Sequence, residues 1–335
     1  MKNKISIKGI SELAGVSIAT VSRIINENGR YSKETEERVK KIIEEYDYIP
    51  DMVAKGLRTK KMTNIGIIVP EITNEFFVKL AYEIEINLFR SGYSSFICNT
   101  NEDVEMEQKR LQMMRMQNVS GLIYISGGSS GVTEYIQDIP TVFIDRTPPV
   151  INDTDNQFII IESDNVQGGY LATRELLDKG CRKIIMLTDY RRLSSQKARI
   201  EGYEKAHRES GIAVNPDYVI NLDKMNFETA FAAVSKLLEE GVPFDGIFAT
   251  TDWLALGSYA ALNKKGIKIP REVKIVGYDD ISVSEFNALP ITTIHQQIDV
   301  IGKTAVDYML QLLKDNPIEE KKLCVPVYLV KRQST

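Results

Sequence analysis

From Thr63 onward, short apolar runs alternate with amphipathic stretches of helical spacing, and this alternation constrains the fold more than any other feature of the chain. The apolar runs predict strands at 64–70, 95–99, 119–126, 141–145, 158–162, 183–188, 218–222, 246–250 and 273–278. The stretches between them predict helices that include 76–91, 166–179, 196–210, 227–240 and 253–265. Strands that alternate with helices in this way form parallel sheets that are covered on both faces. The region is longer than one ordinary sheet requires, so we expect an α/β body of two similar lobes, with ligands bound at the carboxyl ends of the strands.

Residues 1–46 carry a different pattern, which predicts three short helices. Ser17 is suited to cap the second of them. The apolar positions of that helix fall on one face, which leaves Ile18, Ala19 and Arg23 on the opposite face. This arrangement fits a helix-turn-helix whose second helix enters the major groove, where Arg23 would bind a guanine edge. On the pattern alone, a three-helix bundle with a polar face and no role in DNA binding is an equally good interpretation.

Charge also separates this segment from the rest of the chain. The formal net charge is −4, yet residues 1–61 hold thirteen Lys or Arg against nine Asp or Glu, and the remainder holds 29 against 37. A basic segment fused to an acidic body is typical of a polyanion-binding module attached to another domain. Residues 50–61 are basic and have only a thin apolar face, so a free helix there would be marginal. We interpret them as a linker that becomes ordered only against a partner.

Composition excludes several other classes of protein. A hydrophobic content of 43% and a charged content of 26% are inconsistent with a fibrous or globally disordered chain. No apolar run approaches the ~18–20 residues that cross a bilayer, and the first residues lack the apolar region of a signal peptide. Three widely spaced cysteines and two histidines favour neither a disulfide framework nor a metal site. We therefore expect a cytoplasmic protein without a metal, a cofactor or a membrane partner.

One short motif points to a different class of function. Residues 127–131 match G-x-S-x-G after a predicted strand, so Ser129 could be a hydrolase nucleophile, with Asp279 and His295 completing a triad in the right chain order. The motif is, however, a Gly/Ser-rich loop of a common kind, and no oxyanion-hole sequence accompanies it. No G-x-x-x-x-G-K or G-x-G-x-x-G sequence indicates nucleotide chemistry. A hydrolase would also leave the amino-terminal helices unexplained, so we expect a protein that is not an enzyme.

Long stretches of the chain resemble one known family. The amino-terminal part reads ISIKGISELAGVSIATVSRIINENGRYSKETEERV, followed by YDYIPDMVAKGLRTKKMTNIGIIVP. The body continues with SDNVQGGYLATRELL, ARIEGY, GIFATTDWLALG, VKIVGYDD and LPITTIHQQIDVIGKTAVDYML. Together these segments resemble the lactose/galactose-repressor (LacI/GalR) family of transcriptional regulators, in order and over essentially the whole chain.

The resemblance implies a specific organisation: a helix-turn-helix head at 1–48, a hinge at 49–62 and a two-lobed, periplasmic-binding-protein-like body with parallel sheets at 63–335. Lobe 1 would comprise about 63–158 and 292–318, and lobe 2 about 159–291 and 319–335. The carboxyl end has no leucine heptads for a larger assembly. We therefore expect a homodimer that binds pseudo-palindromic operator DNA.

The residues expected to contact DNA lie in the head and the hinge. They are Ser6, Ser17, Ile18, Ala19, Thr20, Ser22, Arg23, Asn26, Tyr31, Lys55, Leu57 and Arg58. The resemblance implies that Leu57 wedges into the minor groove at the operator centre, where an apolar side chain kinks DNA. Lys55 and Arg58 would contact phosphates.

The resemblance also implies that the two lobes close on a small effector. The expected effector-binding residues are Asn74, Phe76, Phe77, Asp145, Arg146, Asn165, Arg199, Phe227, Asp252, Asp279 and Gln296. Carboxylate, amide and guanidinium groups bridge vicinal hydroxyls, so together with aromatic rings this set favours a sugar or sugar derivative over a purine. We expect a repressor of a carbohydrate-utilisation operon. A catabolite-control regulator that uses a phosphocarrier protein as corepressor is the alternative.

Overall fold

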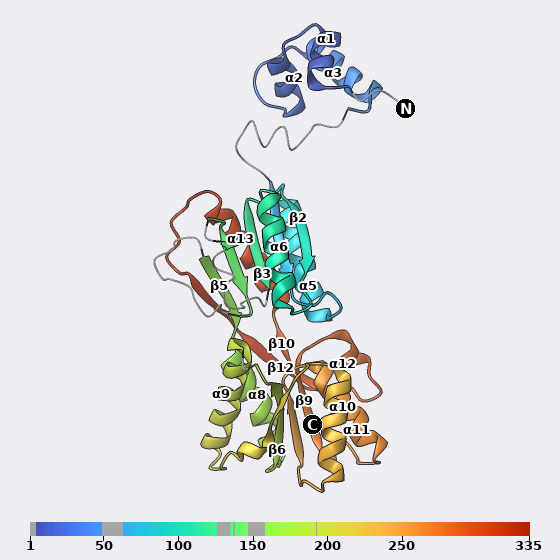
Figure 1. The fold of residues 1–335 in the computed structure, drawn as a ribbon, viewed down its shortest axis with the longest axis vertical. Helices are drawn as coiled ribbons and strands as arrows, with labels where there is room; N and C mark the ends of the chain where they lie inside the picture. The colour runs from blue at the N-terminus through green and yellow to red at the C-terminus, as the bar shows by residue number, and fades with distance from the viewer. Residues whose placement is uncertain (1–4, 49–62, 126–134, 137, 147–157, 192) are drawn as a thin grey trace. The chain divides into compact units, whose positions relative to one another are not determined.

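A computed structural model describes residues 5–48, 63–125, 135–136, 138–146, 158–191 and 193–335. The chain divides into two compact units, a head within Met1–Met62 and a body that spans Thr63–Thr335 (Figure 1). The predicted hinge contacts Lys55, Leu57 and Arg58 lie outside the described residues, as does Ser129.

The head is a three-helix unit with its own small core. Its helices are α1 (Ile7–Ala14), α2 (Ile18–Ile25) and α3 (Lys33–Glu45). The backbone N–H of Thr20 donates to the Ser17 hydroxyl at 3.1 Å, which caps α2, and Gly15 between α1 and α2 adopts a left-handed φ of 64°. The buried core is formed by Ile10, Ala14, Val21, Ile24 and Val39. The predicted division of the second helix into a buried and an outward face is therefore confirmed.

The body contains two twisted sheets, each with six strands among the described residues. The first has the order β11-β5-β4-β3-β1-β2 and is parallel throughout. Its strands are β1 (Asn64–Val69), β2 (Ser94–Asn99), β3 (Gly121–Ile125), β4 (Thr141–Ile144), β5 (Phe158–Ser163) and β11 (Lys322–Val325). The second has the order β12-β10-β9-β8-β6-β7, and only β12 is antiparallel to its neighbour. Its strands are β6 (Ile184–Asp189), β7 (Val219–Leu222), β8 (Gly246–Ala249), β9 (Lys274–Asp279), β10 (Thr292–Gln296) and β12 (Val327–Val330).

Helices cover both faces of each sheet, as Figure 1 shows. On the first sheet, α5 (Glu75–Arg90) and α13 (Ile298–Leu312) pack on one face and α6 (Val104–Met116) on the other. On the second sheet, α8 (Asn165–Asp178) and α9 (Ser194–Glu209) oppose α10 (Phe227–Glu239) and α11 (Asp252–Lys264). The short α12 (Ser282–Phe286) and a 3-10 turn, η1 (Pro216–Tyr218), complete this lobe. The fold is therefore the predicted α/β body with a separate helical head, and none of the helices described is long and apolar enough to cross a membrane.

The chain passes between the two sheets after β5, β10 and β11. Each of these passages lies a few residues beyond the lobe boundary expected near 158, 291 or 318. β5 and β11 pair within the first sheet, and β10 pairs within the second. A strand's own apolar pattern does not specify which sheet it joins, because its pairing partners are distant in sequence.

Candidate ligand-binding cleft and DNA-binding face

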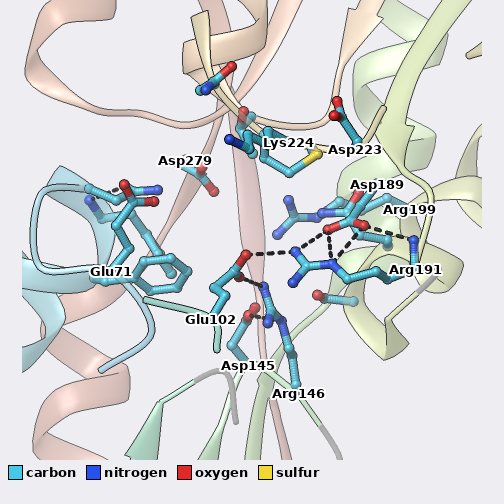
Figure 2. A pocket seen from close by; sticks show the side chains of 18 of the residues that line it. Glu71, Glu102, Asp145, Arg146, Asp189, Arg191, Arg199, Asp223, Lys224 and Asp279 are labelled. Carbon is cyan, nitrogen blue, oxygen red and sulfur yellow. Dashed lines mark hydrogen bonds and ion pairs between the residues drawn. The ribbon is translucent and has the colours of Figure 1, made fainter. Parts of the chain in front are cut away.

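A cavity of about 440 Å³ lies between the two lobes, at the carboxyl ends of their strands (Figure 2). Its size is within the range of small-molecule sites. The first lobe contributes Glu71, Asn74, Phe76, Phe77, Asn101, Glu102, Asp145 and Arg146. The second contributes Asp189, Arg191, Ser195, Gln196, Arg199, Asp223, Lys224, Met225, Asn226, Thr251 and Asp279. The loops that follow parallel strands therefore form the site, as expected for this class of fold.

The structure brings most of the predicted effector-binding residues together. Those that line the cavity are Asn74, Phe76, Phe77, Asp145, Arg146, Arg199 and Asp279. Four predicted residues, Asn165, Phe227, Asp252 and Gln296, are not in its lining. The sequence interpretation also missed the charged loops after β2, β6 and β7, which supply Glu102, Arg191 and Lys224 among others.

Arg199 is the most firmly positioned group of the cavity. Its side chain is buried, and its Nε donates to Asn165 Oδ1 at 2.8 Å while Nη1 donates to the carbonyl oxygen of Thr250 at 2.6 Å. The guanidinium carbon lies 3.6 Å from the centre of the Tyr278 ring. The Asn165 amide is itself fixed, because its Nδ2 donates to the carbonyl oxygen of Ser163 at 3.0 Å. Asn165 therefore orients Arg199 from behind the cavity rather than lining it.

Two glycines allow the helices on either side of Arg199 to approach closely. A Cβ at Gly169 of α8 would collide with the carbonyl oxygen of Arg199, and one at Gly202 of α9 would collide with that of Val166. Only glycine permits this backbone-to-backbone packing. The close contact sets the distance between Asn165 and Arg199, so these glycines help to position Arg199. Their position on facing helices was not predicted from the sequence.

Two aspartates of the lining adopt left-handed backbone conformations, with φ of 105° at Asp279 and 71° at Asp145. Such conformations are costly for residues other than glycine and are concentrated at functional sites. Gln296 lies behind Asp279 and donates from Nε2 to its Oδ1 at 2.8 Å. Burial raises the pKa of Asp279 well above its ordinary value, the Arg199 charge opposes this rise, and the charges of Asp252 and Asp145 add to it.

Asp252 and Phe227 have structural partners that differ from their expected role in effector binding. The Asp252 carboxylate is fully buried, where it accepts hydrogen bonds from the Thr293 hydroxyl at 2.6 Å and from the Ile281 backbone at 2.9 Å. Phe227 is half-buried, stacks on Phe231 and packs against the core beneath α10 and α11. Both residues begin a helix, and sequence position alone does not show whether such a side chain turns toward the cleft or toward the core.

The buried Asp252 makes stability depend on pH. Burial raises its pKa from 3.8 to about 7 against the opposing effect of its hydrogen bonds, so the folded body holds this proton where the unfolded chain has lost it. The ionisation of Asp252 therefore lowers the free energy of unfolding as the pH rises from about 4 to 7, and its effect is constant above about pH 7. Asp252→Asn should remove this dependence of stability on pH. Its free energy of unfolding should therefore rise relative to that of wild type, by up to about 4 kcal/mol, as the pH increases from about 4 to 7. Urea unfolding at several pH values measures the difference, with Asp315→Asn at an exposed position as control. An unchanged slope would contradict a raised pKa.

The outward face of α2 is the candidate DNA-binding surface. Ile18, Ala19 and Arg23 are exposed, whereas Ser22 is half-buried and the Nδ2 of Asn26 donates to its carbonyl oxygen at 2.6 Å. Of the other predicted contacts in the head, Ser6 and Ser17 are exposed caps of α1 and α2, and Thr20 and Tyr31 are half-buried. The arrangement leaves Arg23 and two small or apolar side chains available to base edges.

The groups proposed for a hydrolase do not form a catalytic pair. His295 Nδ1 lies 2.8 Å from Oδ2 of Asp280, and its ring stacks on Tyr328. Asp279 is instead bonded to Gln296, and Ser129 lies outside the described residues. The described acid and histidine therefore do not support a triad.

A helix-turn-helix head joined to a two-lobed body with a ligand-sized cavity defines a class of protein, the ligand-responsive DNA-binding repressors of transcription. Two family models match the chain. One, described as bacterial regulatory proteins of the lacI family, matches residues 6–51, and the other, described as periplasmic binding proteins and the sugar binding domain of the LacI family, matches 62–333. The chain belongs to the LacI family.

Comparison with individual proteins agrees with this assignment. The HTH-type transcriptional repressor PurR of Haemophilus influenzae (strain PittEE) is 33% identical over 327 residues, which cover 94% of each chain. The lac repressor dimer bound to operator and the anti-inducer ONPF is 26% identical, with a TM-score of 0.88 over 99% of each chain. A LacI family transcriptional regulator from Enterococcus faecium with bound ribose is 29% identical, with a TM-score of 0.70 over 81% of this chain and 98% of that one.

Proposed function

We propose that this protein represses a carbohydrate-utilisation operon and that a sugar or sugar derivative in the cavity controls its affinity for the operator. The observation that carries this proposal is the locked guanidinium of Arg199 in a cavity that Asp279 and Asp145 also line. A planar fork of donors beside carboxyl groups suits adjacent hydroxyls of a polyol. The protein is proposed to act by binding alone, without catalysis.

Aromatic side chains and the comparisons support the same ligand class. Phe76 and Phe77 lie in the first turn of α5 at the cavity wall and pack edge to face, with ring centroids 5.3 Å apart. Aromatic faces next to hydrogen-bonding groups are typical of sites that bind ring-shaped polar ligands. The Enterococcus faecium regulator contains bound ribose, which supports a sugar as one ligand class for this cavity.

A binding screen tests the effector class. We expect one or more sugars or sugar derivatives to raise the melting temperature of the protein, since a ligand that binds the folded state stabilises it. Operator DNA, selected from random sequence, is then titrated with and without that ligand, and each should alter the other's affinity by the same factor. Stabilisation by purines and not by any sugar would overturn the proposed ligand class, and a ligand without effect on DNA binding would overturn the proposed control.

The head is proposed to bind operator through the exposed face of α2, with Ser6, Ser17, Ile18, Ala19, Thr20, Ser22, Asn26 and Tyr31 contributing around Arg23. Arg23→Ala should cost on the order of 1–3 kcal/mol in operator affinity and relax the preference at one base pair, because a bidentate contact to guanine is lost. Titration with the selected operator and with single-base variants measures both effects. Arg38→Ala on α3 removes the same charge and should not alter the base preference. Unchanged preference in the Arg23 variant would show that another residue reads that base.

The hinge is proposed to act together with the head. Leu57 would wedge into the minor groove, and Lys55 and Arg58 would contact phosphates, so that the segment adds affinity only where the operator bends. Binding to a pseudo-palindrome requires two heads related by a two-fold axis.

A homodimer is proposed to supply the second head. The outward face of α5 exposes Val78, Tyr82 and Phe89, and the neighbouring strand β2, at the edge of the first sheet, exposes Phe96 and Ile97. An exposed apolar surface of this kind marks an interaction site. The dimer described for the lac repressor structure supports the same assembly.

A further inference from the structure

One carboxylate in the cavity is held by arginines from both lobes. Glu102 follows β2 of the first lobe, and its Oε1 accepts from Nη2 of Arg146 at 3.1 Å while its Oε2 accepts from Nη2 of Arg191 at 2.8 Å (Figure 2). Arg146 follows β4 of the first lobe, and Arg191 follows β6 of the second. The two guanidinium groups thus hold a single carboxylate, with one oxygen for each.

Each of the two arginines has a carboxylate of its own lobe beside it. Nε of Arg191 donates to both carboxylate oxygens of Asp189 at 3.0 Å, and Nε of Arg146 lies 3.7 Å from Oδ2 of Asp145. Burial would lower the pKa of Arg191, but the hydrogen bonds and charges of Asp189 and Glu102 outweigh it and raise that pKa. The arginine pair is therefore a preformed anion site with its own supporting acids.

Glu102, which supplies the carboxylate, belongs to the loop between β2 and α6. It lies on a turn at which both Asn101 and Glu102 adopt left-handed φ values of 52° and 55°. Such values are uncommon and costly for residues other than glycine. The side chains of Glu102 and Arg191 are each about one quarter exposed, at 28% and 26%. A change in this turn can therefore withdraw the carboxylate without disturbing a strand or a helix.

We propose that the Arg146–Arg191 pair binds an anionic group of the effector, and that Glu102 occupies this subsite while the effector is absent. The ligand class is a sugar that carries a carboxylate or a phosphate, which rests on the proposed function and narrows it. The ligand's anion replaces the Glu102 carboxylate one for one, so neither arginine is left unpaired in the cleft. Arginine pairs with carboxylate and phosphate in the same bidentate geometry.

The exchange also keeps the lobes connected. Glu102 and Arg191 join the lobes across the cavity, as do Glu75 of α5 and Ser282 of α12 through hydrogen bonds of 2.9 and 2.7 Å. An anionic ligand would bridge the same two arginines and would connect the lobes in place of Glu102. The other acids of the lining, Glu71, Asp223 and Asp279, do not pair with these arginines and lie away from them in Figure 2. Negative charge on the ligand is therefore accommodated at this pair.

The test compares sugars that share a ring and differ in charge. Thermal shift and calorimetry are run with glucose, glucuronate and glucose 6-phosphate, with galactose and galacturonate, and with ribose and ribose 5-phosphate. We expect an anionic member to bind more tightly than its neutral parent. The variants are Glu102→Gln and Arg191→Gln. Glu105→Gln is the matched control, because Glu105 is exposed and pairs with Lys109 of its own helix.

Glu102→Gln removes the competing carboxylate, so affinity for the anionic sugar should rise roughly tenfold or more, whereas Arg191→Gln should lower it by roughly 10- to 100-fold. Glu105→Gln should change neither. Equal binding of neutral and anionic members, with no response to Glu102→Gln, would overturn the anion subsite and leave sugar control intact. The absence of any anionic sugar that stabilises the Glu102→Gln variant would overturn it as well. Stabilisation by purines alone would instead remove the proposed function. Comparison of carboxylates with phosphates identifies which anion is used.

Discussion

Arg199→Ala is expected to abolish control by the effector while leaving operator binding by the ligand-free protein intact. Loss of one partner from a buried, hydrogen-bonded charged contact costs about 2–5 kcal/mol, which is roughly a 30- to 5,000-fold loss of ligand affinity. Arg199 suits such a role because Asn165, Thr250 and Tyr278 fix its guanidinium before any ligand arrives. Calorimetric titration with the sugar found in the screen, followed by operator titration with and without it, measures both parts of the expectation.

The variant must be distinguished from one that is merely less stable. Arg199→Lys keeps the charge but loses the rigid fork, so it should bind the ligand weakly and remain folded. Arg208 lies on the exposed face of the same helix, so an Arg208→Ala variant should behave like wild type. Melting temperatures without ligand show how much stability each change removes. An Arg199→Ala protein that binds the sugar and responds to it like wild type would refute the assignment of the cleft.

Much of this fold could be predicted because the apolar pattern is local. Each of the strands predicted from runs of Val, Ile and Leu is found, from β1 to β9. β10, β11 and β12 were not predicted as strands. Lys322–Val325 mixes polar with apolar residues, and all three strands are short and are stabilised by pairing with strands from other parts of the sequence. The positions at which the chain passes between lobes depend on the same long-range pairing and were misplaced by a few residues.

The site was predictable to the extent that strand ends determine it. Asp145, Arg199 and Asp279 all lie where the alternating pattern and the family resemblance placed them. Asn165 and Gln296 were identified as contacts with ligand, yet they hold Arg199 and Asp279 from behind. Sequence position does not distinguish a residue that lines a cavity from one that supports the lining, because the two differ only in the direction of the side chain.

The missed residues share a different cause. Glu102 and Arg191 lie in loops of separate lobes, and their pairing appears only when both sheets are in place. A usable signal did exist, since Arg191 follows the end of β6 by two residues, at the edge where such folds bind ligands.

Phe89→Asp is expected to convert the protein into a monomer and to weaken operator binding by orders of magnitude. The Phe89 side chain is 69% exposed on α5, on the surface that also presents Tyr82 and the edge strand β2. A carboxylate there would have to be buried without a partner in any dimer that uses this face. In a dimer, binding of one head raises the effective concentration of the other at the second half-site, which increases affinity by about 10²- to 10⁴-fold. A monomer carries one head and loses this increase.

Sedimentation measures the assembly, and operator titration measures the consequence for DNA. Met116→Asp is the matched control, since Met116 is 80% exposed at the end of α6, which covers the opposite face of the sheet. That variant should stay dimeric and bind operator normally. Both proteins should still bind the sugar, because neither residue lines the cavity. A Phe89→Asp protein that remains a dimer would show that another face joins the subunits, whereas a monomer with full operator affinity would separate DNA recognition from dimerisation.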